Sequence, residues 1–182
     1  MQLSRKLAIL MLLLSGHRCQ TLHLLDTRNM SLSPSKASFQ IGDLMKSSRP
    51  GHHVSQITFK AYAPDRRLCV LTTLKAYLRR TLDHRGNVNQ LFLTSKPPYR
   101  AASRDTIRRW VRQAMMSSGI DVSIFAPHSI RSAATSAAAT HLPLTAIVKA
   151  IGWSSQSTFT TYYHKPLVRN GLIGSAVLQN CN

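Results

Sequence analysis

The ten-residue stretch from Leu7 to Gly16, LAILMLLLSG, is almost entirely apolar and limits what the start of the chain can form. It is too short to cross a bilayer as a helix, which takes about 20 residues. Because it follows a basic start, it has the form of a secretory signal peptide, and in that interpretation an exported mature chain begins near Cys19. The alternative is the buried first helix of a folded domain.

Apolar residues beyond Gly16 favour the buried helix. Leu22, Leu24 and Leu25 continue an apolar face after the point where a leader would be cleaved, and a processed leader has no reason to be followed in this way. We therefore expect residues 17–26 to continue the first helix, and we prefer a folded domain to a secreted protein.

The charge balance points to a polyanionic partner. The 182 residues hold 24 Lys and Arg against 6 Asp and Glu, a formal net charge of +18, while 43% are hydrophobic, so the chain can fold as one domain. Nucleic acid is the first partner to consider, before an anionic membrane surface or an acidic protein. Cys19, Cys69 and Cys181 show neither a disulfide framework nor a metal-binding spacing, which favours a reducing compartment.

Periodicity and turn residues predict an α+β domain that is mainly helical, with a small antiparallel sheet. Residues 31–38 form a polar turn in this prediction, and residues 39–62 form the short strands. The expected helices span residues 65–82, 104–119 (capped by Ser103 and Asp105), 128–141 and 144–152, followed by a last helical segment before Pro166.

Two motifs in the last third of the chain carry candidate chemistry. His128 and Arg131 are three residues apart, so one helix turn presents a proton-transfer group beside a guanidinium that can clamp a phosphate. Alone, this pattern equally fits a solvated helix start. Trp153 and the pair Tyr162 and Tyr163 follow in GWSSQSTFTTYYHKP, and a tyrosine hydroxyl can attack phosphorus to form a phosphotyrosine.

The order Arg, His-x-x-Arg, Trp and Tyr resembles that of the tyrosine recombinase (phage integrase) superfamily, and the segment around Trp153 is most similar to recombinases of DIRS and Crypton mobile elements. The resemblance implies the catalytic domain of that fold, with site-specific recombination or integration of double-stranded DNA through a covalent 3′-phosphotyrosyl intermediate and no metal or other cofactor. It assigns His128 as a proton shuttle, Arg131 as a phosphate clamp and Trp153 as a donor to a phosphate oxygen.

The resemblance also assigns two residues nearer to the N-terminus. Arg18 matches the first phosphate clamp, although Thr21 stands where the family usually has an acidic residue that holds this arginine. The family's lysine general acid lies on a hairpin of the small sheet. We choose Lys46 for this role, because Lys36 precedes the expected sheet and Lys60 lies at its far end.

Tyr163 is the preferred nucleophile of the two adjacent tyrosines. Tyr162 lies nine residues after Trp153, the spacing usual in phage-type members, whereas Tyr163 lies ten after it. The flanking Phe159 and the HKP of residues 164–166 match the mobile-element pattern in which the second tyrosine reacts. Tyr162 is then expected to be a packing aromatic.

The expected DNA contacts and domain organisation follow the same resemblance. Contacts to the DNA backbone are expected from the arginines of one helix, Arg104, Arg108, Arg109 and Arg112, for which an ordinary solvated face is the alternative.

Only seventeen residues precede Arg18, so residues 1–182 are expected to be one catalytic domain without the family's core-binding domain. Relatives act as tetramers on paired sites, in the nucleus when eukaryotic, with no membrane role. The alternative function is an inactive DNA-binding domain derived from a mobile-element recombinase.

Overall fold

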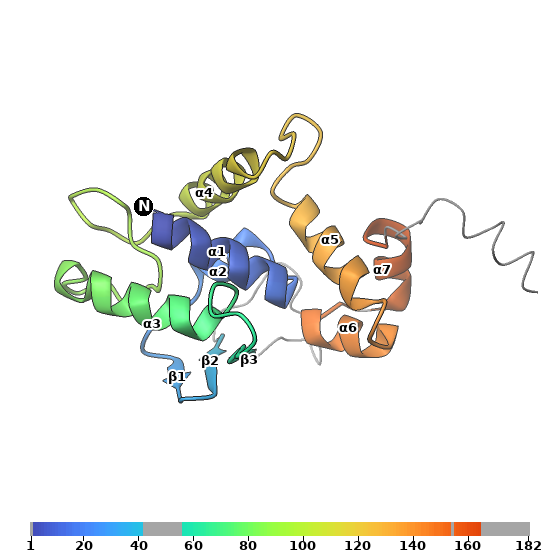
Figure 1. Ribbon diagram of the computed structural model, residues 1–182, viewed down its shortest axis with the longest axis horizontal. Coiled ribbons are helices and arrows are strands. Elements are labelled where there is room, and N and C mark those ends of the chain that lie inside the picture. The colour runs from blue at the N-terminus through green and yellow to red at the C-terminus, as the bar shows by residue number, and fades with distance from the viewer. Residues whose placement is uncertain (1, 42–55, 154, 165–182) are drawn as a thin grey trace, which may run out of the picture.

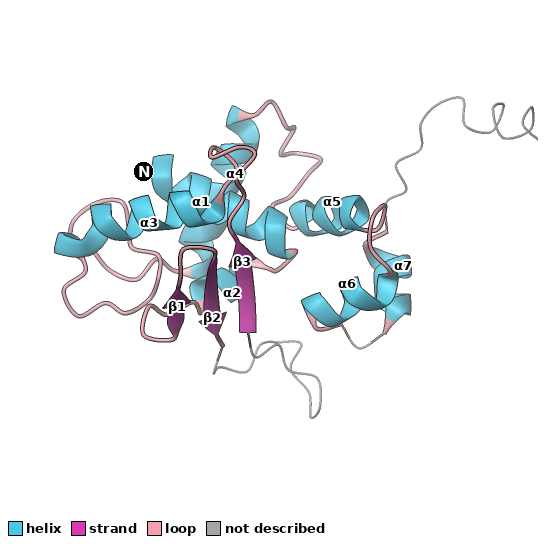
Figure 2. Ribbon diagram, turned by 60° about the horizontal axis from the view of Figure 1, so that its bottom comes forward, coloured by secondary structure: helices cyan, strands magenta, loops and turns pink. Residues whose placement is uncertain are grey.

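The computed structural model describes residues 2–41, 56–153 and 155–164, and it confirms a mainly helical α+β fold with a small antiparallel sheet (Figures 1 and 2). The elements in chain order are α1 (Gln2–Ser15), α2 (Cys19–His23), β1 (Met30–Leu32), β2 (Lys36–Gln40), β3 (Gln56–Lys60), α3 (Val70–Thr81), the 3-10 helix η1 (Leu82–His84), α4 (Arg104–Ser117), α5 (Ser129–Ala138), α6 (Leu144–Ile151) and α7 (Gln156–Tyr162).

Helix α1 lies at the centre of the fold, in contact with α3, α4 and α5 (Figure 1). Leu7, Ala8 and Met11 are fully buried in the main hydrophobic core. Burial of such side chains on several sides of one helix is the largest favourable contribution to folding. The apolar run at the start of the chain therefore forms the core of this domain. In the described part of the chain, no helix is both long and apolar enough to cross a membrane.

The expected continuation of α1 beyond Gly16 is wrong. Gly16 has a positive φ of +63°, and the chain turns there before α2 starts at Cys19. A Cβ at this position would lie 2.9 Å from Ile151 Cδ1, so glycine is required both by the backbone conformation and by the close approach of α6. The turn leaves His17 and Arg18 between two helices, where their side chains point away from the main core.

The sheet has the order β1-β2-β3, with both pairs antiparallel (Figure 2). Residues 31–38 are not a polar turn, because they contain most of β1 and the start of β2. Lys36 likewise does not precede the sheet: it begins β2, where it pairs with Lys60. Phe39, Ile57 and Phe59 are buried, and they hold one face of the sheet against the main core.

The remaining helices follow the predicted caps with small changes in length. Ser103 caps α4 by accepting from the Thr106 N–H at 3.1 Å, and Gly152, with a φ of +74°, ends α6. The expected helix over 65–82 is shorter, because Leu68 and Leu82 lie outside α3 and are exposed. A second apolar cluster joins α6 and α7 and contains Ile147, Ile151, Trp153, Phe159 and Tyr163.

Candidate active site

The hydroxyl group of Tyr163 is the point where the predicted site residues meet. Arg18 Nη2 donates to Tyr163 Oη at 3.3 Å, and His128 Nε2 lies 3.2 Å from the same oxygen. Arg18 is the residue just before α2 and His128 the residue just before α5, so two helix starts converge on one phenol. Ser136 of α5 donates to the Tyr163 carbonyl at 3.0 Å, which fixes the backbone that carries the phenol.

Arg131 lies beneath this contact and is only 4% exposed. Its Nη1 donates to the Gly16 carbonyl at 2.9 Å, which ties α5 to the turn that carries Arg18. The Nε atom is buried and has no hydrogen-bond partner among the described residues. Because a buried donor without a partner is costly, this atom marks a place for an acceptor from a ligand.

Trp153 is the second buried side chain with an unused donor. The residue is 6% exposed, and its ring stacks on the Tyr163 ring with the centroids 4.7 Å apart. In the described part of the chain, the indole Nε1 has no hydrogen-bond partner. Since an indole N–H can only donate, Trp153 and Arg131 together offer two donors that fit an oxyanion.

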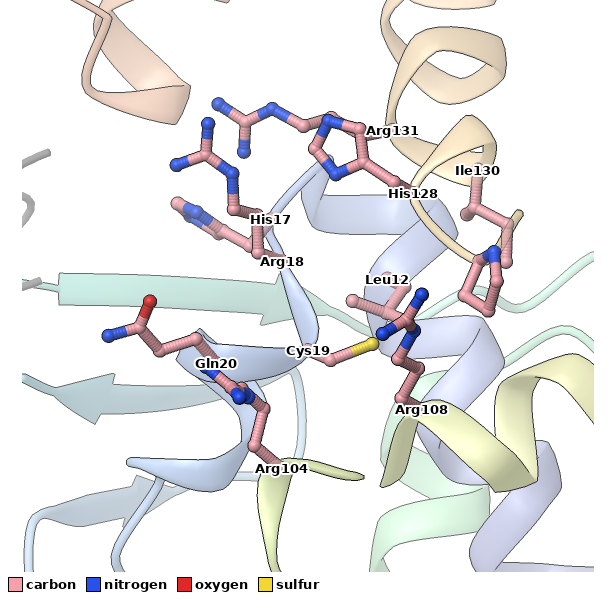
Figure 3. A pocket seen from close by; sticks show the side chains of 11 residues that line it. Leu12, His17, Arg18, Cys19, Gln20, Arg104, Arg108, His128, Ile130 and Arg131 are labelled. Atoms are coloured by element: carbon pink, nitrogen blue, oxygen red, sulfur yellow. The ribbon is translucent and has the colours of Figure 1, made fainter. Parts of the chain in front are cut away.

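The cavity beside these residues has a volume of about 350 Å³ and is lined mainly by basic side chains (Figure 3). It is bordered by Arg18 and His17 from the turn, by His128 and Arg131 from α5, and by Arg104 and Arg108 from α4. Its lining includes no carboxylate. The site is therefore a concentration of positive charge without an internal counter-ion, which attracts an anion.

The two histidines of the cavity are held in their neutral form. Burial, followed by the charges of Arg18 and Arg131, lowers the pKa of His128 below its ordinary value. Burial, then Arg131, then Arg18, lowers the pKa of His17 to about 4. Arg131 remains cationic at neutral pH, although burial and the nearby Arg18 lower its pKa. A neutral His128 beside a phenol is able to accept its proton.

The structure brings together most, but not all, of the residues predicted from the sequence. Arg18, His128, Arg131, Trp153 and Tyr163 converge, whereas Lys46 lies outside the described residues. Among the four arginines expected to contact DNA, Arg104 and Arg108 line the cavity, and the exposed Arg109 and Arg112 do not.

Tyr162 is 70% exposed, so the expectation that it packs as an aromatic is wrong. Phe159 and Tyr163, four residues apart, face the second apolar cluster, and Tyr162 is left pointing to solvent. His17 also borders the cavity, although no motif in the sequence points to it. Its position next to Arg18 is the one sequence feature that could have indicated it. In the described ranges, no group of three or more His, Cys, Asp or Glu side chains is placed to hold a metal ion.

The fold is that of a tyrosine recombinase catalytic domain. The chain matches the phage integrase family over residues 1–167, and it belongs to that family. The same fold is found in XerA recombinase, with a TM-score of 0.67, 19% identity and coverage of 98% of this chain and 59% of that one.

The XerH site-specific recombinase in a pre-cleavage complex with its difH substrate gives a TM-score of 0.67 at 17% identity, over 98% of this chain and 48% of that one. Its post-cleavage complex with palindromic difH gives 0.64 at 16% identity, over 97% and 46%. The chain thus spans about half the length of these recombinases. No curated protein matches it.

Proposed function

We propose that this chain breaks and rejoins double-stranded DNA through a covalent 3′-phosphotyrosyl intermediate on Tyr163. The observation that carries the proposal is the convergence of Arg18 and His128 on the Tyr163 hydroxyl, at 3.3 and 3.2 Å. Tyr162 is not the nucleophile in this proposal, because its side chain is exposed to solvent, and in the described part of the chain Arg18 and His128 contact the Tyr163 hydroxyl instead.

In the cleavage step, the Tyr163 oxygen attacks a backbone phosphorus, the Oη–P bond forms, and the bond from phosphorus to the 5′ oxygen breaks. The phenolic proton passes to neutral His128, and the leaving 5′ oxygen takes a proton from a general acid. The reverse attack by a 5′ hydroxyl restores the phosphodiester and frees the tyrosine. Because the phosphotyrosine keeps the bond energy, the two strands are rejoined without a nucleotide.

The donors of the site suit the charge that develops during attack. The phosphorane carries more negative charge than the diester, and preorganised donors in a buried site stabilise that change most strongly. Arg18 and Arg131 supply guanidiniums, and Trp153 supplies an indole N–H that has no other partner among the described residues. The Gly16 carbonyl, which accepts from Arg131, fixes the orientation of the second clamp.

Lys46 is the proposed general acid for the leaving 5′ oxygen. Lys36 and Lys60, the two other candidates, pair with each other at one end of the β2–β3 ladder. Gln40 and Gln56 pair at the opposite end. Segment 42–55, which contains Lys46, joins those latter ends. A substrate with sulfur in place of the bridging 5′ oxygen tests the role, since a thiolate leaves without protonation. Lys46→Ala should be slow on the normal DNA and near wild type on the sulfur-containing DNA, with Lys60→Ala as the control.

Arg104 and Arg108 are proposed to bind backbone phosphates next to the cleavage point. They are four residues apart on α4, so they share one helix face, and both border the cavity that contains Arg18. Arg109 and Arg112 are proposed to contact DNA further from the cut. Contacts of this kind add affinity that depends on salt and little sequence preference.

Covalent trapping on nicked DNA tests the function. A pool of duplexes with randomised sequence and a nick just downstream of each potential cleavage point is incubated with the 182-residue chain, and protein–DNA adducts are isolated under denaturing conditions. The short fragment released at the nick diffuses away, so the phosphotyrosine accumulates. Wild type and Tyr162→Phe should yield a protease-sensitive adduct, and Tyr163→Phe should yield none.

Each other result has a definite meaning. An adduct that survives Tyr163→Phe but disappears in Tyr162→Phe would move the nucleophile to the exposed tyrosine. Salt-sensitive DNA binding with no adduct from any variant would support the second candidate, a DNA-binding domain that has lost its chemistry, which the missing acidic residue at Thr21 favours. Sequencing of the trapped DNA would also reveal any target preference.

The proposed biological setting is a mobile element or a gene derived from one, with action in the nucleus if the host is eukaryotic. Self-association on paired sites is part of the proposal, because strand exchange needs a phosphotyrosine on each partner strand. The 182 residues are proposed to act as the catalytic domain.

A further inference from the structure

His17 is a buried histidine that the reaction described above does not use. It is 5% exposed and borders the same cavity as Arg18, His128 and Arg131. Figure 3 shows its imidazole on the same side of the cavity as the guanidiniums of Arg18 and Arg131. Its backbone N–H donates to Ser15 Oγ at 3.3 Å, but in the described part of the chain no hydrogen bond reaches the ring.

The surroundings of the ring favour a neutral imidazole. A cation at this position would add a buried positive charge next to the buried guanidinium of Arg131 and the half-buried one of Arg18, in a cavity whose lining has no carboxylate. The low pKa of His17, caused by burial and by both arginines, agrees with this. A neutral imidazole has one N–H donor and one nitrogen that accepts.

The neighbouring charges determine how the two nitrogens are used. Guanidiniums only donate hydrogen bonds. The imidazole nitrogen of His17 on the side of Arg18 and Arg131 is therefore favoured as the one without a proton, which accepts. The remaining N–H then needs an acceptor. The arginines that line the cavity cannot supply one, whereas an oxygen of a bound phosphate can.

We propose that His17 donates a hydrogen bond, as a neutral imidazole, to a non-bridging oxygen of the phosphate that Tyr163 attacks. The inference rests on the proposed function, because it assumes that the cavity binds the reacting phosphate. A neutral donor stabilises the phosphorane without adding repulsion to the empty site. It also releases no counter-ion on DNA binding, which distinguishes it from every arginine of the cavity.

Three substitutions test the donor role with the trapping assay. His17→Leu removes both nitrogens, His17→Asn keeps an amide N–H near the position of Nδ1, and His17→Gln keeps one near the position of Nε2. We expect a loss on the order of 100-fold in adduct formation for Leu, the cost of one oxyanion donor, and recovery to within about tenfold in one of the two amides. The slope of DNA affinity against salt should not change in any of them.

The opposite results overturn the role. Wild-type adduct formation in His17→Leu would show that the ring does not contact the phosphate. Equal defects in all three variants, with unchanged thermal unfolding, would show that a hydrogen-bond donor is not what matters. A decrease of the salt slope by about 0.9 would show that His17 is charged when DNA is bound.

A measurement that does not need cleavage separates this inference from the proposed function. The ¹⁵N resonances of the histidine rings, assigned with His17→Gln, report tautomer, protonation and hydrogen bonding in the wild-type chain. On addition of the randomised duplex pool, the His17 N–H nitrogen should shift while the ring stays neutral, and the exposed His141, which does not border the cavity, should not change. Unchanged His17 resonances at saturating duplex, or a protonated His17 ring, would overturn the inference even if the chain forms the adduct.

Discussion

The guanidinium carbon of Arg131 lies 4.7 Å from the centroid of the Trp153 indole ring. The same carbon lies 5.2 Å from the centroid of the Tyr163 ring, and the two aromatic rings stack on each other. Arg131, Trp153 and Tyr163, the proposed phosphate clamp, donor and nucleophile, therefore pack against one another. Because a planar guanidinium can stack on aromatic rings and a lysine ammonium cannot, the identity of Arg131 matters beyond its charge.

Arg131→Lys should therefore lower the rate of adduct formation by about 100-fold or more, although it conserves the charge. A lysine cannot keep the bond to the Gly16 carbonyl and present further donors to a phosphate in the same fixed plane. Arg112→Lys, on the exposed face of α4 outside the cavity, is the matched control and should retain wild-type activity. Near-normal trapping by Arg131→Lys would mean that point charge alone suffices at this position.

Trp153→Phe should separate activity from stability. The change removes the indole N–H but keeps an aromatic ring against Tyr163, so adduct formation should fall by about 10- to 100-fold, the value of a hydrogen bond to a charged group. Loss of packing area is offset by removal of a buried donor without a partner among the described residues. The free energy of unfolding in urea should thus change by about 1 kcal/mol or less. Partial recovery of activity in Trp153→His would support the donor role.

The free energy of unfolding should decrease as the pH falls from 6.5 to about 4, the unfolded and folded pKa values of His17. Its folded pKa of about 4 lies below the ordinary 6.5, so the unfolded chain binds the proton first. The free energy of unfolding should be constant above pH 6.5, fall as the pH decreases, and lose about 3 kcal/mol from this group by pH 4. His128 acts in the same direction. Urea titrations from pH 7.5 to 4.5 should show a flatter profile for His17→Gln than for the wild-type chain.

Local signals predicted the parts of the fold that depend on local chemistry. Ser103 at the start of α4 and Gly152 at the end of α6 were both predicted, because a cap acts within one helix turn. Strand β1 and the start of β2 were missed, since the serines and proline of residues 31–38 favour a turn and only pairing with neighbouring strands overrides that preference.

Sequence motifs predicted the residues of the site that belong to them. They did not predict the features of the site that depend on tertiary packing. Arg18 and Tyr163 were selected by their resemblance to the family's motifs, Tyr163 from the residues that flank it, and their side chains are in contact across 145 positions. The exposure of Tyr162 and the burial of His17 depend on which face of each segment meets α5 and α6. Adjacent residues of similar type carry no local signal for that difference.

DNA binding should distinguish Arg108, which borders the cavity, from Arg112, which lies one turn further along the same face of α4. Arg108→Gln removes a guanidinium that borders the cavity, so it should lower the slope of log affinity against log salt by about 0.9 and weaken binding on all sequences. Arg112→Gln should have a smaller effect on trapping at the cut, because this side chain lies outside the cavity. Fluorescence anisotropy at several salt concentrations measures the slope. Equal slopes for Arg108→Gln and wild type would remove Arg108 from the phosphate contacts.

Gly16→Ala should damage both the fold and the site, because the turn at Gly16 positions His17 and Arg18. The new Cβ would meet Ile151 Cδ1 at 2.9 Å and Thr135 Cγ2 at 3.2 Å, in a backbone conformation with a φ of +63°. The backbone strain alone costs about 1 to 2 kcal/mol, and the contact with α5 and α6 adds to it.

Gly119→Ala is the matched control for this prediction. Its φ is +76°, but its Cβ would enter open space, so it carries the strain without the contact. Gly16→Ala should therefore lose more unfolding free energy than Gly119→Ala in urea, and only Gly16→Ala should lose adduct formation. Equal stability losses with retained trapping in both variants would show that the approach of α6 to the turn does not position the arginine clamp.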